Sequence, residues 1–304
     1  MESKLAVELA GLRLRNPIMV CSGTFGSGAE YAEFMDLESL GAIITKSVTA
    51  SPRGGNKPPR IWETPCGMLN SIGLENKGVE RFIEEDLAPL AELALPVIAS
   101  VAGSSVEEYV EVAGRLTSSG RVQALELNVS CPNVKRGGVE FGMESQTTCE
   151  LVGRVKERCS LPVFVKLSPL VPDLAGMASQ LQQAGADGLS LINTVPGMAV
   201  DLETRQPRLG AVTGGLSGRA IHPIAVRSVW TARQSVGIPI IGMGGVADGR
   251  SALELMVAGA NAVAVGTANF TDPGITVKII RDIESFMQAQ GLKRISDLVG
   301  SLRI

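Results

Sequence analysis

The segment at residues 163–192, VFVKLSPLVPDLAGMASQLQQAGADGLSLI, decides the fold. It begins with an apolar run, Val163–Leu167, that is typical of a buried strand. Residues 174–184 then place apolar side chains three and four positions apart, as an amphipathic helix does. A second apolar run follows at 188–192. The segment is therefore predicted to form a strand, a helix and a second, parallel strand.

The same unit recurs along the chain. Eight apolar runs are predicted to be strands, at 17–21, 42–46, 97–101, 124–128, 163–167, 188–192, 238–242 and 262–265. Helical spacing occurs between several of them, at 106–116, 174–184, 224–234 and 250–257, and 275–290 is predicted to be a closing helix. Eight strand–helix units predict an α/β fold of the (β/α)8 or TIM-barrel type. A doubly wound Rossmann-like sheet is the competing fold, because strand count alone does not exclude it.

Length and composition limit the class of protein. With 304 residues, of which 45% are hydrophobic, the chain suits one barrel domain over residues 1–304, with long active-site loops at 48–77 and 195–218. The net charge of -3 and the lack of a Lys/Arg-rich block argue against nucleic-acid binding. Residues 1–14 mix charged and apolar side chains, without the apolar core of a signal peptide or a membrane span. We therefore expect a cytoplasmic protein with no membrane partner.

The five cysteines, Cys21, Cys66, Cys131, Cys149 and Cys159, are odd in number and form no CxxC pair. This pattern argues against a disulfide framework and against a zinc or iron–sulfur site, so no metal is expected on this chain. Cys131 differs from the others because it lies just after the predicted strand at 124–128, where a thiol can act as a base. The other four are expected to be small buried side chains.

Polar residues close most of the predicted strands. In a (β/α)8 barrel the active site lies at these carboxyl ends. The residues in question are Ser22, Lys46, Ser47, Asn128, Lys166, Asn193, Thr194, Gly244, Gly245, Gly266 and Thr267. Amides, hydroxyls and two lysines suit a planar, anionic substrate beside a cofactor. No pair of carboxylates occurs there, which argues against glycosidase chemistry.

Glycines follow the last two predicted strands. Backbone N–H groups at Gly244, Gly245 and Gly266 would lie where such barrels often hold phosphate, so a phosphorylated cofactor is expected. Tight turns are the alternative explanation. Gly242, Gly244 and Ala247 also match the dinucleotide pattern G-x-G-x-x-A, but the next strand supplies no acidic residue for a ribose. An NAD site on this chain is therefore not predicted.

The general base and the role of the lysines remain open at this point. The only histidine, His222, is expected at a helix start rather than in catalysis. A base would then be Cys131 or a lysine. Lys166 could instead form a Schiff base, as in barrel aldolases, and this is the non-redox alternative. A non-catalytic barrel that binds a phosphorylated ligand is a third possibility.

Four motifs together resemble the class 1 dihydroorotate dehydrogenases over nearly the whole chain. They are NVSCPN at 128–133, NSIGL at 70–74, Lys46-Ser47, and GMGG at 242–245. The loop SPRGGNKPPR at 51–60 and the short N-terminus look most like the catalytic subunit of the NAD-linked type, class 1B. The fumarate-linked class 1A is one alternative. Dihydropyrimidine dehydrogenase, which shares part of the NVSCPN hexapeptide, is another.

The resemblance implies one FMN per chain and oxidation of (S)-dihydroorotate to orotate in de novo pyrimidine (UMP) biosynthesis. Cys131 would remove a proton from C5 while hydride leaves C6 for N5 of FMN. The substrate would be held by Lys46, Asn70, Ser71, Ile72, Gly73, Leu74, Asn128, Asn193 and Thr194. FMN would be held by Ser22, Lys46, Ser47, Ser100, Asn128, Lys166, Ile192, Gly218, Gly244, Gly245, Gly266 and Thr267. Relatives often have Asn at the place of Ser100. The shorter hydroxyl side chain of Ser100 is therefore the one departure from the family's pattern of FMN contacts.

The same resemblance implies a partner, because electrons must leave reduced FMN before the next turnover. A separate subunit carrying FAD and a 2Fe-2S cluster would pass them to NAD. Two catalytic chains, which also pair as a homodimer, would assemble with two partner subunits into a heterotetramer.

Overall fold

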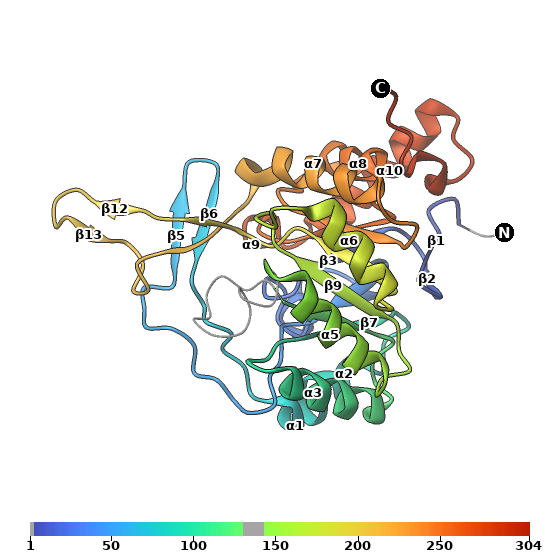
Figure 1. The fold of residues 1–304 in the computed structure, drawn as a ribbon. Helices are drawn as coiled ribbons and strands as arrows, with labels where there is room; N and C mark the ends of the chain where they lie inside the picture. The colour runs from blue at the N-terminus through green and yellow to red at the C-terminus, as the bar shows by residue number, and fades with distance from the viewer. Residues whose placement is uncertain (1–2, 130–142) are drawn as a thin grey trace.

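The computed structural model describes residues 3–129 and 143–304, and its centre is a closed barrel of eight parallel strands (Figure 1). The order around the barrel is β10-β15-β16-β3-β4-β7-β8-β9. The strands are β3 (Ile18–Val20), β4 (Ala42–Ile44), β7 (Val97–Val101), β8 (Ala124–Asn128), β9 (Val163–Leu167), β10 (Gly188–Leu191), β15 (Ile240–Met243) and β16 (Ala262–Val265). Each predicted strand is found, and β7, β8, β9 and β16 have the predicted bounds. The (β/α)8 barrel is confirmed, and the Rossmann-like alternative is wrong because the sheet closes on itself.

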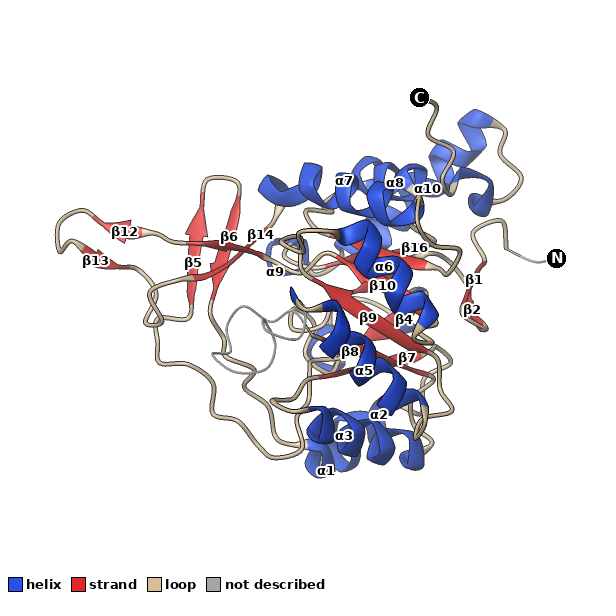
Figure 2. Ribbon diagram, viewed as in Figure 1, coloured by secondary structure: helices blue, strands red, loops and turns tan. Residues whose placement is uncertain are grey.

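Helices cover the outside of the barrel (Figure 2). They are α1 (Val79–Arg81), α2 (Leu87–Leu90), α3 (Val106–Ser119), α5 (Ser145–Lys156), α6 (Leu174–Gln183), α7 (His222–Arg233), α8 (Gly249–Ala258), α9 (Ala268–Thr271) and α10 (Ile275–Gln290). Shorter helical turns are η1 (Ala29–Tyr31), η2 (Leu37–Ser39), η3 (Phe82–Asp86), η4 (Arg219–Ile221) and η5 (Ile295–Leu298). The predicted helices are present, and His222 begins α7 as expected. Their apolar stripes face the sheet, which explains the three- and four-residue spacing.

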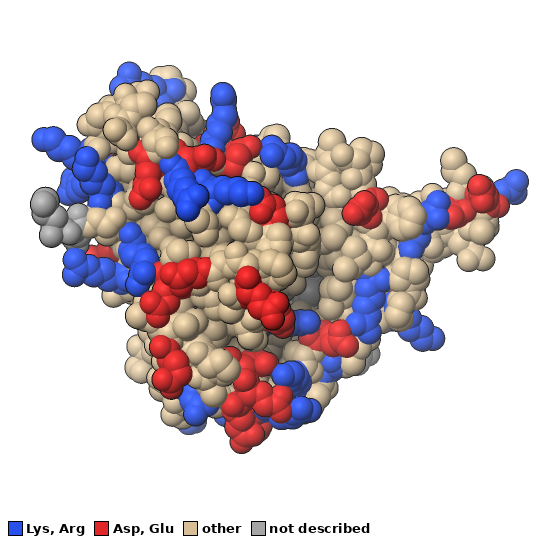
Figure 3. Space-filling model, turned by 180° about the vertical axis from the view of Figure 1, so that it is seen from behind, with Lys and Arg blue, Asp and Glu red and all other residues tan. Residues whose placement is uncertain are grey.

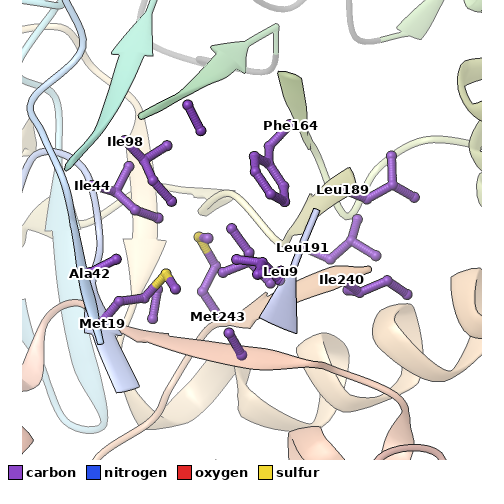
Figure 4. Packing of buried hydrophobic residues seen from close by; sticks show 14 of the residues in the cluster. Leu9, Met19, Ala42, Ile44, Ile98, Phe164, Leu189, Leu191, Ile240 and Met243 are labelled. Carbon is purple, nitrogen blue, oxygen red and sulfur yellow. The ribbon is translucent and has the colours of Figure 1, made fainter. Parts of the chain in front are cut away.

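The barrel strands are apolar on both faces because one face fills the interior and the other packs against helices. Ile44, Ile98 and Phe164 are fully buried and lie among the core side chains of Figure 4. Gly188 on β10 makes room for one of them, since a Cβ atom there would lie 2.3 Å from Cε1 of Phe164. The N-terminal hairpin of β1 (Val7–Leu9) and β2 (Leu12–Leu14) adds Leu9 to this core.

The two long connections predicted as loops contain strands that pair with each other. β5 (Ile61–Thr64) and β6 (Gly67–Asn70) come from the first connection, and β11 (Val195–Gly197) and β14 (Gly214–Ser217) come from the second. They form an antiparallel sheet in the order β11-β14-β6-β5, which projects from the barrel (Figure 1). A hairpin of β12 (Val200–Asp201) and β13 (Gln206–Pro207) extends it further. The predicted long loops at 48–77 and 195–218 therefore contain short strands, and their pairing joins segments far apart in the sequence.

The surface carries charges of both signs. Figure 3 shows acidic and basic side chains interspersed over one face of the barrel and along the sheet and hairpin that project from it. Among the residues at 3–129 and 143–304, no helix is long and apolar enough to cross a membrane.

Candidate active site

A cavity of about 660 Å³ lies at the carboxyl ends of the barrel strands, beside the projecting sheet. This volume is typical of a small-molecule site. The predicted site residues that line it are Ser22, Lys46, Ser47, Asn70, Ile72, Gly73, Leu74, Asn128, Lys166, Ile192, Asn193, Thr194, Gly218, Gly244, Gly245, Gly266 and Thr267. The fold thus brings together residues spread over more than two hundred positions, because parallel barrel strands end at one face.

Two of the predicted residues that the structure describes, Ser71 and Ser100, do not line the cavity. Ser71 is buried, and its hydroxyl accepts a hydrogen bond from Nδ2 of Asn56 at 2.8 Å, so it holds the loop that carries NSIGL. Ser100 is fully buried behind Ser47. Cys131, the predicted base, lies outside the described residues.

A chain of hydrogen bonds along the wall of the cavity joins residues at or near the ends of four strands, β10, β8, β4 and β7. Nδ2 of Asn193 donates to Oδ1 of Asn128 at 3.3 Å, and Nδ2 of Asn128 donates to Oγ of Ser47 at 3.0 Å. The hydroxyl oxygens of Ser47 and Ser100 are 2.8 Å apart. These bonds fix which way each amide points, so the wall presents a defined pattern of donors and acceptors to a ligand.

Lys166 projects from β9 into the cavity wall and is 5% exposed. Its Nζ atom donates to Oγ of Ser22 at 2.9 Å and lies 3.5 Å from Oε1 of Glu126. Glu126 is fully buried and was not predicted as a site residue. A carboxylate in the middle of a predicted buried strand was the signal that could have identified it.

Lys46 follows β4 and is half-buried at the cavity. Within the described part of the chain its ammonium group makes no hydrogen bond or ion pair. Arg219, which also lines the cavity, is paired instead with Asp248 at 3.2 Å. Lys46 is therefore placed to meet an anionic group of a ligand.

The glycine loops after β15 and β16 line one side of the cavity. Gly245 has φ of +71°, and a Cβ atom there would lie 2.6 Å from Cβ of His222, so only glycine fits. Among the described residues, the main-chain N–H groups of Gly244, Gly245 and Thr267 donate to no other main-chain carbonyl. Oγ1 of Thr267 donates to Oγ of Ser217 at 2.8 Å and ties this loop to the projecting sheet. Such a set of free N–H donors suits a phosphate group.

Cys21 lines the cavity at the end of β3. Burial raises the pKa of its thiol to about 12, the positive charge of Lys166 lowers that pKa, and the negative charge of Glu126 raises it. The thiol is therefore protonated at neutral pH and behaves as a small apolar group, as expected.

The other described cysteines differ in exposure. Cys159 is buried and Cys149 is partly buried, but Cys66 is exposed. The expectation of burial is wrong for Cys66, because it lies in the tight turn between β5 and β6, at the tip of a hairpin that projects from the barrel.

Comparisons with known proteins identify relatives over almost the whole chain. A sequence profile of the family described as Dihydroorotate dehydrogenase matches residues 4–287. A protein of Desulforudis audaxviator is 51% identical over 99% of this chain and 98% of its own length, and one of Geobacillus kaustophilus is 52% identical over 98% and 95%. Both are named dihydroorotate dehydrogenase B (NAD(+)), catalytic subunit.

The structure of dihydroorotate dehydrogenase from Eimeria tenella, in complex with ferulenol, superimposes with a TM-score of 0.83 and 20% identity. The superposition covers 98% of this chain and 88% of the Eimeria tenella chain, which confirms the fold. The resemblance inferred from the four motifs is also confirmed, both for the family and for the NAD-linked type. The chain belongs to the dihydroorotate dehydrogenase family.

Proposed function

We propose that this chain, as one FMN-binding barrel domain, oxidises dihydroorotate to orotate in pyrimidine biosynthesis as the catalytic subunit of an NAD-linked enzyme. The observation that carries the proposal is the meeting, in one cavity, of the cations Lys46 and Lys166 with a row of amides and two glycine loops. The family and its relatives support the same reaction. The names of the two relatives reported above favour this reaction over the alternatives, which are a Schiff-base aldolase, a dihydropyrimidine dehydrogenase, the class 1A enzyme and a non-catalytic barrel.

The residues present fit FMN. The unpaired main-chain N–H groups of Gly244, Gly245 and Thr267 would hold its phosphate. Ser22, Ser47 and Lys166 would hold polar atoms of the ring, together with Ile192, Gly218 and Gly266 along the cavity. When bound, FMN supplies the two-electron oxidation. The fixed charge of Lys166, in a wall with little water, favours an anionic ring there.

Ser100 takes a different part from the one that the resemblance implies. It is fully buried, and its hydroxyl bonds to Ser47, which does line the cavity. We therefore propose that Ser100 supports the cofactor site through Ser47, without touching FMN.

The substrate side of the cavity would be built around Lys46. Its ammonium group would bind the carboxylate of dihydroorotate, and the amides of Asn70, Asn128 and Asn193 would bind the amide edge of the ring. Thr194, Ile72, Gly73 and Leu74 complete that side, and Ser71 holds the loop in place. Cys131 remains the proposed base for the proton at C5.

A spectrum and a reduction experiment test this function. The purified chain should be yellow, with flavin released as FMN, and dihydroorotate added without oxygen should bleach the flavin band. Borohydride should trap no carbonyl substrate on Lys166. A protein that binds no flavin, or a bound flavin that dihydroorotate leaves oxidised, would contradict the proposal.

Electrons would leave this chain through a partner. We propose a subunit that carries FAD and a 2Fe-2S cluster and passes electrons to NAD, with two catalytic chains, themselves a homodimer, and two partners in a heterotetramer. The names of the relatives, which specify NAD(+) and a catalytic subunit, support a separate partner. The isolated chain should reduce artificial dyes but not NAD. Steady reduction of NAD by the chain alone would contradict this, and comparable reduction of fumarate would favour the class 1A type.

A further inference from the structure

A carboxylate lies inside the barrel next to Lys166. Glu126 is on β8, where its register neighbours are Ser100 on β7 and Phe164 on β9. Its Oε1 atom accepts from Oγ of Ser100 at 3.3 Å and lies 3.5 Å from Nζ of Lys166, and both distances are long. Its Oε2 atom is buried and has no hydrogen-bond donor among the residues that the structure describes.

Stability does not explain this residue. A carboxylate loses much of its hydration when it is buried, and a long ion pair with one unsatisfied oxygen does not fully offset that loss. Branched apolar side chains usually fill the interior layers of such a barrel. Glu126 therefore occupies a position where an apolar side chain would serve the fold at least as well.

Glu126 contacts Lys166 directly, and it is also linked through the hydroxyl of Ser100 to Ser47 on the cavity wall. Lys166 lines the cavity and Glu126 does not. The ammonium group lies closer to Ser22 on the cavity side, at 2.9 Å, than to the carboxylate behind it, at 3.5 Å. Lys166 is thus held between a hydroxyl that faces a ligand and a carboxylate that does not.

The charge of Glu126 is nevertheless felt at the cavity wall. Cys21 lines the same cavity, and the pKa of its thiol is lowered by Lys166 and raised by Glu126. The two charges therefore oppose each other at a group that a ligand would contact. Little water reaches these buried side chains, so solvent screens them weakly.

We propose that Glu126 is a positioning residue that holds the ammonium group of Lys166 against Ser22 and offsets part of its charge, and so lowers the reduction potential of the bound flavin. The inference rests on the proposed binding of FMN. Reduced flavin carries more negative charge than oxidised flavin, so a lysine without its carboxylate partner would stabilise the reduced form more strongly. Glu126 thereby keeps the flavin a better electron donor to the next carrier.

The test is the midpoint potential of the flavin in variants that retain FMN. Glu126→Gln keeps the size of the side chain and removes its charge. Reduced FMN should then bind about tenfold more tightly relative to oxidised FMN, which raises the potential by about 30 mV for a two-electron couple. Glu150→Gln, an exposed change on α5, is the matched control and should leave the potential unchanged.

Two further variants show whether the effect passes through Lys166. In a Lys166→Met background, the rise caused by Glu126→Gln should disappear. Glu126→Asp keeps the charge but moves it one methylene group farther from Lys166, so a smaller rise in the midpoint potential is expected. This variant tests the inference if Glu126→Gln does not fold.

The outcomes separate this inference from the proposed function. An unchanged or lower potential in the Glu126 variants would overturn it, as would an equal rise with and without Lys166. Melting of the flavin-free protein is the second readout, and Glu126→Gln should melt no lower than the wild type. A large loss of stability with an unchanged potential would assign Glu126 to the fold. If the wild type binds no FMN, the proposed function itself fails.

Discussion

Replacement of Lys46 by Ala is expected to weaken the binding of orotate strongly while FMN stays bound. Lys46 is half-buried two residues after the end of β4, and in the described part of the chain no acidic residue pairs with its ammonium group. Its charge is therefore available to the ligand. A hydrogen bond to a charged group contributes about 1.5–3 kcal/mol. At about 1.4 kcal/mol for each tenfold change, the Kd of orotate should rise by about 10-fold to 150-fold.

The assay is a titration of the flavin spectrum with orotate at fixed ionic strength, after the FMN content of each variant has been measured. Lys293→Ala, an exposed change far along the chain, is the matched control and should leave the Kd unchanged. Lys46→Arg keeps the charge and should lose less affinity than Lys46→Ala. An unchanged Kd in Lys46→Ala would refute the reasoning, and loss of FMN with normal affinity for orotate would assign Lys46 to the cofactor.

Three further predictions test other parts of the molecule. Cys131→Ala should keep FMN but slow flavin reduction by dihydroorotate by a factor on the order of 10²–10⁴, as measured by stopped-flow absorbance. Cys131→Ser should recover activity only as pH rises, because a hydroxyl is far less acidic than a thiol. Near-normal reduction by the Ala variant would remove Cys131 from the mechanism. Gly245→Ala should weaken FMN binding about tenfold, because the added Cβ atom meets His222 and an alanine in this left-handed backbone conformation is strained by about 1–3 kcal/mol. An FMN affinity equal to that of the wild type would argue against this loop as the phosphate site. Asp248→Ala removes the capping box of α8 and should lower the free energy of unfolding by about 0.5–2 kcal/mol near pH 7. Hydrogen bonds from Ser251 lower the pKa of Asp248. The stabilisation by Asp248 is therefore present above the pKa of an unfolded Asp and is lost as pH falls through the lower pKa of the folded state. If urea unfolding shows the same stability difference between Asp248→Ala and the wild type at about pH 2 as at pH 7, this prediction is contradicted.

The barrel was predictable because its signals are local. Apolar runs such as Val163–Leu167 and Ala124–Asn128 mark strands buried on both faces, and the spacing in the segments between them marks helices. Once parallel strands are recognised, the carboxyl ends must meet at one face. Most of the candidate site followed from that rule, including Lys46 and Lys166, without any knowledge of contacts.

Other features depend on contacts between distant segments. β6 and β14 are short strands some 145 residues apart, joined for example by Nδ2 of Asn70 and the carbonyl of Gly215, and neither has a pattern that indicates a strand alone. Their pairing builds the projecting sheet beside the cavity. It also explains why Cys66, in the hairpin turn, is exposed.

The sequence by itself determined the fold class, the face that carries the site and most residues that line it, because strand and helix periodicity and the direction of parallel strands are properties of short segments. Only the tertiary structure decided which side chains become neighbours across the closed barrel. It placed Ser100 behind Ser47 and set Glu126 against Lys166. The two residues of these pairs are 53 and 40 positions apart in the sequence. They become neighbours through the register between adjacent barrel strands, which no short segment contains.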